Sequence, residues 1–283
     1  MSIFVTGDIH ASYDIAKISE SCFDTTGLTK DDYVIVCGDF GLVWNNTASE
    51  QYWLRWLDAR PFTTLFVDGN HEGFALLNSL PETTWNGGRV HQVANSVFHL
   101  QRGQMFDIDG YRIFTMGGAA SSEYDREHRV LGETWFTEEV PNEQERATAI
   151  ETLNQAGWIC DLVITHCAPT SAAKGISKHT DRLEIHPMDE YTDWLQTIQD
   201  RLTYTHWFCG HYHIDAQIQE NTTALYNRIA MLKEPESAND AKGSDASTLP
   251  YQLLAEAAKE PKHAITDYAT DLDDQDSLEI DLE

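Results

Sequence analysis

The sequence is poor in positive charge. Its 283 residues include 19 Lys and Arg against 46 Asp and Glu, which gives a formal net charge of −27. Tight, nonspecific binding of duplex nucleic acid depends on basic side chains that neutralise phosphates, so this balance argues against a duplex-binding protein. A small phosphorylated substrate remains compatible with the charge, because bound metal ions can reverse the local field.

The sequence also lacks the features of a membrane or secreted protein. We find no apolar run near the roughly 20 residues that a membrane-spanning helix needs. The first ten residues have neither a basic start nor a long apolar stretch, so they do not resemble a secretory signal. The five cysteines are odd in number and show no Cys-x-x-Cys spacing, which is typical of reduced thiols. These absences predict a cytoplasmic protein with no membrane segment, and they leave its oligomeric state open.

Acidic residues are concentrated at the C-terminal end. Residue 234 and those that follow include 14 acidic residues and 3 lysines, which is typical of a solvated, disordered tail. We therefore expect a folded domain over residues 1–232 and an acidic, disordered tail over residues 233–283. Within the tail, residues 248–260 could form one short helix that docks on the domain or binds a partner.

Short apolar runs rich in β-branched residues recur along the chain. They cover residues 2–6, 33–37, 64–67, 112–116, 161–165 and 205–209. Each is bounded by Gly, Asp or Asn, which is typical of buried strands. Residues 97–100 and 105–108 predict a hairpin that turns around Arg102 and Gly103.

Helical patterns alternate with these runs. They cover residues 50–59, 142–157 and 188–202, and in the second of them Asn142 and Glu145 form a capping box. Strands that alternate with helices predict an α/β fold, and the expected hairpin adds antiparallel pairing.

Polar side chains that can bind a metal follow five of the predicted strands. They belong to Asp8, His10, Asp39, Asn70, His166, His211 and His213. In open α/β sheets, ligand sites lie just outside the carboxyl ends of the strands, so we expect these side chains to meet. His211 and His213 are two residues apart, so in an extended segment both imidazoles point the same way.

The chemistry of this set predicts a metal centre. It combines carboxylate and amide oxygens with imidazole nitrogens and contains no thiolate, which suits Mn, Fe or Zn better than Mg or Ca. Seven ligands are too many for one tetrahedral ion, but they suit two divalent ions about 4 Å apart that share a carboxylate. We expect manganese in the site, with iron or zinc as alternatives.

The ordered motifs GDIH, GD, GNHE, TH and GHYH resemble those of the calcineurin-like metallophosphoesterase superfamily, over residues 7–213. The stretches GDFGLVW, FVDGNHE and TMGGAASSEYDRE look like the small bacterial and prophage-type members. The resemblance implies a four-layer α/β/β/α sandwich of two mixed β-sheets with the metals at one edge. It also implies a dinuclear metal-dependent phosphoesterase, in which a hydroxide that bridges the two ions attacks phosphorus.

The resemblance further implies a role for each residue. It divides the seven residues between two ions, with Asp8, His10 and His213 on the first, Asn70, His166 and His211 on the second, and Asp39 shared. It makes His71 the catalytic residue that protonates the leaving oxygen or steadies the transition state. Either Asp68 or Glu72 could orient His71.

One motif departs from the superfamily. Protein Ser/Thr phosphatases carry GDxxDRG at the second motif, whereas this chain has GDFGLVW and so lacks the phosphate-clamping arginine. This departure weakens a protein-phosphatase interpretation. The basic residues that could take over the clamping role are Arg102, Arg126, Arg129 and Lys174.

Three functional hypotheses remain after this step. The first is hydrolysis of a phosphomonoester or a small phosphodiester, with a nucleotide among the possible substrates. The second is a nuclease or nucleotide pyrophosphatase that uses the same site. The third is a non-catalytic, metal-bound adaptor that acts through its acidic tail, although the complete set of ligand positions together with His71 favours an enzyme.

Overall fold

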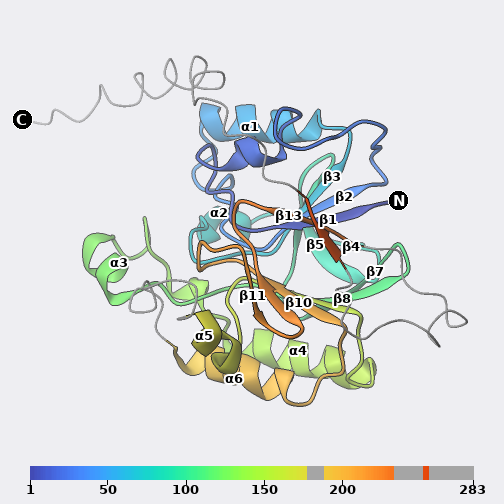
Figure 1. Cartoon of the computed structure of the whole chain (residues 1–283). Helices are drawn as coiled ribbons and strands as arrows, with labels where there is room; N and C mark the ends of the chain where they lie inside the picture. The colour runs from blue at the N-terminus through green and yellow to red at the C-terminus, as the bar shows by residue number, and fades with distance from the viewer. Residues whose placement is uncertain (177–187, 233–250, 255–283) are drawn as a thin grey trace, which may run out of the picture.

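An eight-stranded mixed sheet forms one half of the fold (Figure 1). The computed structural model describes residues 1–176, 188–232 and 251–254. The strands of this sheet are β1 (Ile3–Thr6), β2 (Tyr33–Val36), β3 (Thr63–Phe66), β4 (Glu82–Trp85), β5 (Gly88–Ala94), β6 (Val97–Leu100), β13 (Ile229–Leu232) and β14 (Tyr251–Leu253). Their spatial order is β14-β13-β1-β2-β3-β6-β5-β4. β1, β2, β3 and β6 run parallel, and the flanking strands pair antiparallel.

A six-stranded mixed sheet forms the other half. Its strands are β7 (Gln104–Ile108), β8 (Tyr111–Met116), β9 (Leu162–Thr165), β10 (His206–Cys209), β11 (Ala216–Gln219) and β12 (Thr222–Ala224), in the spatial order β11-β12-β10-β9-β8-β7. β8, β9, β10 and β12 are parallel. β1, β3, β9 and β10 are buried along their whole length, as expected of parallel strands that are covered on both faces.

Helical segments alternate with the strands along the chain. They are η1 (Ile15–Ile18), α1 (Ala48–Asp58), α2 (Phe74–Leu77), α3 (Glu123–His128), η2 (Thr137–Glu139), α4 (Glu143–Gln155), α5 (Thr170–Ile176) and α6 (Glu190–Gln199). Figure 1 shows α1 on one side of the two sheets and α4, α5 and α6 on the opposite side. The expected helices are therefore present, and α4 begins with the predicted capping box of Asn142 and Glu145.

Three apolar cores separate the layers. Val34 and Val36 of β2 pack in the core that holds η1 and α1, whereas Ile35 between them packs in the core that joins the two sheets. The third core joins the second sheet to α4, α5 and α6. Because successive side chains of a strand point to opposite faces, each apolar run supplies two cores at once. The result is the predicted four-layer α/β/β/α sandwich of two mixed sheets.

The predicted hairpin over residues 97–108 is wrong. Both strands exist, but β6 pairs with β3 and β5 in the first sheet, and β7 pairs with β8 in the second. The chain crosses between the sheets at Arg102, which is 7% exposed and bound to Asp68 by two hydrogen bonds. A buried, paired arginine in the connection thus replaces the expected hairpin turn.

The short helix expected over residues 248–260 is also wrong where the structure describes it. Tyr251–Leu253 form strand β14, which pairs antiparallel with β13. Without β14, backbone groups at the edge of β13 would have no strand partner. Pairing as a strand also buries the ring of Tyr251, which is 3% exposed. The rest of the expected tail lies outside the described residues, so the division into a domain and a tail stays a prediction.

No helix within the described parts of the chain is both long enough and apolar enough to cross a membrane.

Candidate metal centre

The carboxyl ends of strands from both sheets meet at one edge of the sandwich. β1, β2 and β3 lead to Asp8, Asp39 and Asn70, and β9 and β10 lead to the three histidines of the second sheet. Hydrogen bonds at this edge join the two halves directly. His166 Nδ1 lies 2.7 Å from the carbonyl oxygen of Cys37, and the backbone N–H of His211 donates to Asp8 Oδ1 at 3.0 Å.

Four of the predicted residues form a compact cluster. One ligand atom from each of Asp8, His10, Asp39 and His213 lies within 4.8 Å of the others. His213 Nε2 is 3.1 Å from Asp8 Oδ2, and His10 Nε2 is 3.3 Å from Asp39 Oδ2. This geometry is that of a possible metal-binding group.

The remaining three residues lie directly beside this cluster. His166 Nε2 is 3.2 Å from Asp39 Oδ1 and 3.2 Å from Asn70 Oδ1. The rings of His166 and His211 are 4.9 Å apart. The structure therefore brings all seven residues together, and each oxygen of Asp39 faces a different imidazole.

In His10 and His166, hydrogen bonds at one ring nitrogen determine which nitrogen is available to bind a metal. His10 Nδ1 lies 2.8 Å from Asp14 Oδ2, and His166 Nδ1 bonds the Cys37 carbonyl; both partners can only accept, so both Nδ1 atoms carry hydrogen. In the neutral rings, Nε2 is then a lone pair aimed at oxygen atoms. Lone pairs that converge in this way need a cation between them, so the donor set fits divalent metal ions.

The charges of the site show that its carboxylates are held in the ionised form. Burial acts to raise the pKa of Asp39, but the charge of His166 and the hydrogen bonds from His10 and His166 outweigh it and hold the pKa well below its usual range. Burial acts to lower the pKa of His10 and His166, yet bonds and charges from carboxylates raise them to about 10 and about 9. The buried carboxylates thus require compensating positive charge, which either protons or metal ions can supply.

Several site residues have a backbone conformation that is rare outside glycine. The φ angles of His10, Asp39, His211 and His213 are 41°, 49°, 67° and 51°. Non-glycine residues with positive φ are typically strained, and such residues cluster at functional sites.

Glycines in the same turns allow close approach. A Cβ atom at Gly69 would overlap Asp39 Oδ1, and one at Gly210 would overlap Asp8 Oδ1. These two positions therefore need glycine for space at the site.

The sequence did not reveal several residues that support the cluster. Asp14 orients His10, and its signal would have been the i, i+4 spacing from that histidine. Tyr226 stacks on His213 with ring centroids 4.5 Å apart and donates to Asp14 at 3.2 Å. No local pattern marks Tyr226, because it reaches the site only through the fold.

His71 lies at the rim of the cluster. Its backbone N–H donates to Asp39 Oδ1 at 2.8 Å, and Arg129 Nη2 lies 3.0 Å from both of its ring nitrogens. Burial lowers the pKa of His71, and the charge of Arg129 acts in the same direction. A neutral His71 fits the contact, since a protonated ring could not accept from Arg129.

Neither expected partner orients His71. The Asp68 carboxylate bonds His99 and Arg102, and the Glu72 carboxylate accepts backbone N–H groups of Phe40, Gly41 and Gly69. Glu72 therefore ties the turns that follow β2 and β3 to each other.

The structure shows different surroundings for the four candidate phosphate-clamping residues. Arg102 is buried in its ion pair with Asp68 and also contacts Glu145, so its guanidinium serves the fold. Arg126 donates to the backbone oxygen of Ser121, and Lys174 lies on α5. Among the four, Arg129 is the residue that contacts His71.

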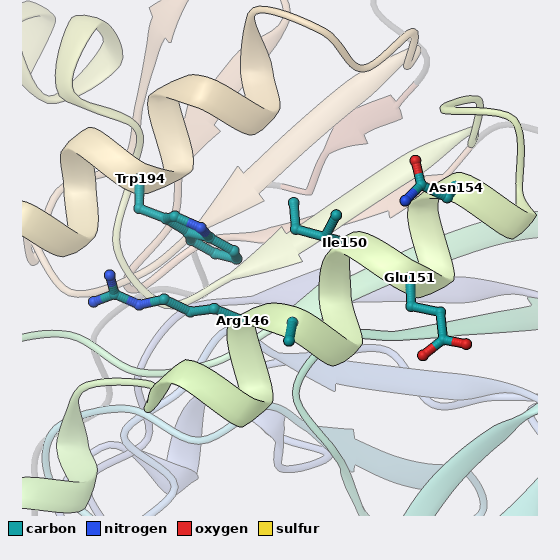
Figure 2. A pocket seen from close by; sticks show the side chains of 6 residues that line it. Arg146, Ile150, Glu151, Asn154 and Trp194 are labelled. Carbon is teal, nitrogen blue, oxygen red and sulfur yellow. The ribbon is translucent and has the colours of Figure 1, made fainter.

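Two hollows lie apart from the cluster. A groove of about 450 Å³ lies between α4 and α6 and is lined by Arg146, Ala147, Ile150, Glu151, Asn154 and Trp194 (Figure 2). A second hollow of about 730 Å³ is lined by residues that include Asp68, His91, His99 and Gln101. Neither contains any of the seven predicted ligand residues.

Comparison with known proteins establishes the class. A sequence model described as calcineurin-like phosphoesterase matches residues 1–215. The chain belongs to the calcineurin-like phosphoesterase family, a class of metal-dependent hydrolases of phosphoric esters. The family expected from the sequence motifs is thereby confirmed.

Individual relatives are more distant. The chain is 22% identical over 241 residues to a lariat debranching enzyme from Drosophila pseudoobscura pseudoobscura, over 75% of this chain and 42% of that protein. It thus spans less than half the length of this curated relative. Among solved structures, it is similar to a phosphopantetheinyl hydrolase from Mycobacterium tuberculosis, with 14% identity, a TM-score of 0.37 and coverage of 80% of this chain and 88% of that one.

Proposed function

We propose that this protein is a dinuclear metal-dependent phosphoesterase that hydrolyses a small phosphomonoester or phosphodiester, with a nucleotide among the candidate substrates. The observation that supports it most is the position of Asp39. Its Oδ1 faces the lone pair of His166 and its Oδ2 faces that of His10, at 3.2 and 3.3 Å. A carboxylate between two separate donor sets is the arrangement that two-ion hydrolases use.

The proposed ligand sets follow from these contacts. Asp8, His10 and His213 would hold the first ion, and Asn70, His166 and His211 the second, with Asp39 shared. When bound, such ions polarise a phosphoryl oxygen and lower the pKa of water so that it attacks at neutral pH. Manganese suits the mixed oxygen and nitrogen donors, and iron or zinc would fit the same set.

The protein's own groups complete the chemistry. Arg129 is the candidate for binding the phosphoryl oxygens, because its planar guanidinium already lies at His71 beside the cluster. When a phosphoryl group takes the guanidinium, His71 is released from that contact and can hold a proton for the leaving oxygen. General-acid catalysis of this kind contributes roughly 10²- to 10⁴-fold to a rate.

Location is a separate proposal. All five cysteines are free, and four of them are buried. Unpaired thiols in a folded domain fit a reducing compartment, which supports a cytoplasmic protein.

The test is hydrolysis of para-nitrophenyl phosphate and bis-para-nitrophenyl phosphate by metal-stripped protein refilled with Mn²⁺. We expect turnover that requires Mn²⁺, and the preferred compound then separates a monoesterase from a diesterase. Turnover of nucleotides or single-stranded nucleic acid alone would favour the pyrophosphatase or nuclease alternative. Two bound ions with no turnover on any of these substrates would favour the non-catalytic adaptor.

A further inference from the structure

Asn70 is the one amide among the seven proposed ligands, and an amide can face a site in two ways. With Oδ1 inward it offers a lone pair to a cation, whereas with Nδ2 inward it offers two N–H donors that repel one. The structure has Oδ1 at 3.2 Å from His166 Nε2 and Nδ2 at 3.3 Å from Ser121 Oγ. The orientation therefore depends on what Ser121 can accept.

Glu139 determines the hydrogen-bonding state of Ser121. Glu139 Oε1 accepts the backbone N–H of Ser121 at 2.7 Å and the indole N–H of Trp135 at 2.8 Å. Its Oε2 lies 2.6 Å from Ser121 Oγ. Burial raises the pKa of Glu139, but the hydrogen bonds that it accepts from Ser121 and Trp135 favour its ionised form. Because an ionised carboxylate only accepts, the hydroxyl hydrogen of Ser121 points at Glu139, which leaves oxygen lone pairs toward Asn70.

We propose that Ser121 and Glu139 are positioning residues that fix the Asn70 amide with its oxygen toward the second metal ion. This proposal rests on the proposed function, because it takes Asn70 as a ligand. The three side chains form one directed series, in which Asn70 donates to Ser121 and Ser121 donates to Glu139.

Burial strengthens the preferred directions of the hydrogen bonds between Asn70, Ser121 and Glu139. Asn70, Ser121 and Glu139 are 4%, 1% and 2% exposed, so bulk water does not offer alternative partners. In such surroundings a polar group left without a partner costs more than it would in water, and the hydrogen-bond directions are strongly preferred.

The two positioning residues belong to the segment between β8 and α4. The same segment carries Arg129 to His71 and Trp135 to Glu139. The proposed second ion and the proposed phosphate-binding residue are therefore supported by one stretch of chain.

The isosteric change Glu139→Gln tests the direction of the series without leaving a cavity. The new amide must keep its oxygen toward the two N–H donors from Ser121 and Trp135, so its NH₂ group faces Ser121 Oγ. The Ser121 hydroxyl then donates toward Asn70, which favours the reversed amide with N–H groups toward the metal. We expect the affinity for the second Mn²⁺ to fall about 10- to 100-fold, as for other groups that orient metal ligands.

The rescue variant is Asn70→Asp combined with Glu139→Gln. An aspartate presents an oxygen to the metal in either orientation, and its other oxygen accepts from the Ser121 hydroxyl. We expect this double variant to regain the second ion. Glu138→Gln is the matched control, because Glu138 is the exposed neighbour on η2.

The measurement is Mn²⁺ binding by calorimetry and metal content after dialysis, with melting temperature in chelator to verify folding. Selective loss of one ion in Glu139→Gln and its recovery in the double variant would support the proposal. Unchanged binding in Glu139→Gln, or a loss that Asn70→Asp does not rescue, would overturn it. A wild-type protein that binds two ions but hydrolyses nothing would overturn the proposed function alone, since the metal counts are read without turnover.

Discussion

The two oxygens of Asp39 are not equivalent. Oδ1 accepts the backbone N–H of His71 at 2.8 Å, whereas Oδ2 faces His10 Nε2 at 3.3 Å. In Asp39→Asn the amide should keep its oxygen at the His71 N–H and turn its NH₂ group toward His10.

We therefore expect Asp39→Asn to lose the ion on the His10 side first, with a fall in hydrolysis of at least about 100-fold. Metal content and calorimetric titration with Mn²⁺ test this. The exposed Asp107→Asn on β7 is the charge-matched control. Normal metal content in Asp39→Asn would refute the proposed bridge.

His71 offers a second test at the scale of one residue. It contacts Asp39 only through its backbone N–H, so His71→Ala should keep both ions and slow hydrolysis. If the ring protonates the leaving oxygen, the loss should approach the roughly 10²- to 10⁴-fold of general-acid catalysis for alkyl phosphates and be much smaller for para-nitrophenyl phosphate. Equal losses on both substrates would exclude the acid role, and loss of metal would make His71 a ligand.

Sequence reasoning found the ligand candidates because each of these residues lies within four residues of the end of a strand. Asp8, Asp39 and His166 come within two residues of a buried apolar run, so their placement is local information. Ser121, Glu139 and Tyr226 reach the site through the fold, and their sequence neighbourhoods carry no comparable signal. Local patterns thus identified the proposed ligands, but not the side chains that orient them.

Among the elements, the last described strand, β14, contacts the second sheet through the side chain of Tyr251. The ring of Tyr251 on β14 packs against His206 and Phe208 with centroids 4.9 and 5.0 Å away, and its hydroxyl lies 2.7 Å from Thr223 Oγ1. These contacts tie the edge of the first sheet to β10 and β12 of the second.

We expect Tyr251→Ala to lower the free energy of unfolding by roughly 3 kcal/mol, the cost of removing a buried aromatic ring. Tyr251→Phe keeps the ring and loses one hydrogen bond, so it should cost about 1 kcal/mol. Urea denaturation of both variants measures the difference. Wild-type stability in Tyr251→Ala would mean that β14 does not dock in solution.

The strands also show where prediction from sequence stopped. Their positions follow from short apolar runs, but nothing in the runs at β6 and β7 tells which sheet each one joins. The buried pair of Arg102 and Asp68 lies where the chain crosses between the sheets, and its partners are 34 residues apart in the chain. Pairing between strands is set by such distant contacts, whereas strand propensity is local.

For the whole molecule, one buried histidine should make stability depend on pH. Burial lowers the pKa of His206 to about 3, against about 6.5 in an unfolded chain. Between these two pH values, His206 is protonated in the unfolded state and neutral in the folded state. The contribution of His206 to the free energy of unfolding is therefore fully present above pH 6.5. It decreases by about 1.4 kcal/mol per pH unit as the pH falls below that value.

Urea unfolding of the wild type and of His206→Gln between pH 7.5 and 5 isolates this contribution. The other titrating groups are shared by both proteins, so the difference in slope belongs to His206. We expect the variant to have the shallower dependence by about one proton. Identical slopes would show that His206 is accessible to protons in the folded state.

The position of β1 has a consequence for synthesis on the ribosome. β1 pairs with β2 nearby in the chain and with β13, which begins at Ile229. At the typical elongation rate of 5–20 residues per second, the first strand waits roughly 10 to 45 seconds for its second neighbour. Asp8 and His213 are separated by almost the same stretch, so the nascent chain has no complete set of proposed ligands until the domain is nearly finished. Metal binding by the complete proposed set is therefore a late event in the synthesis of this chain.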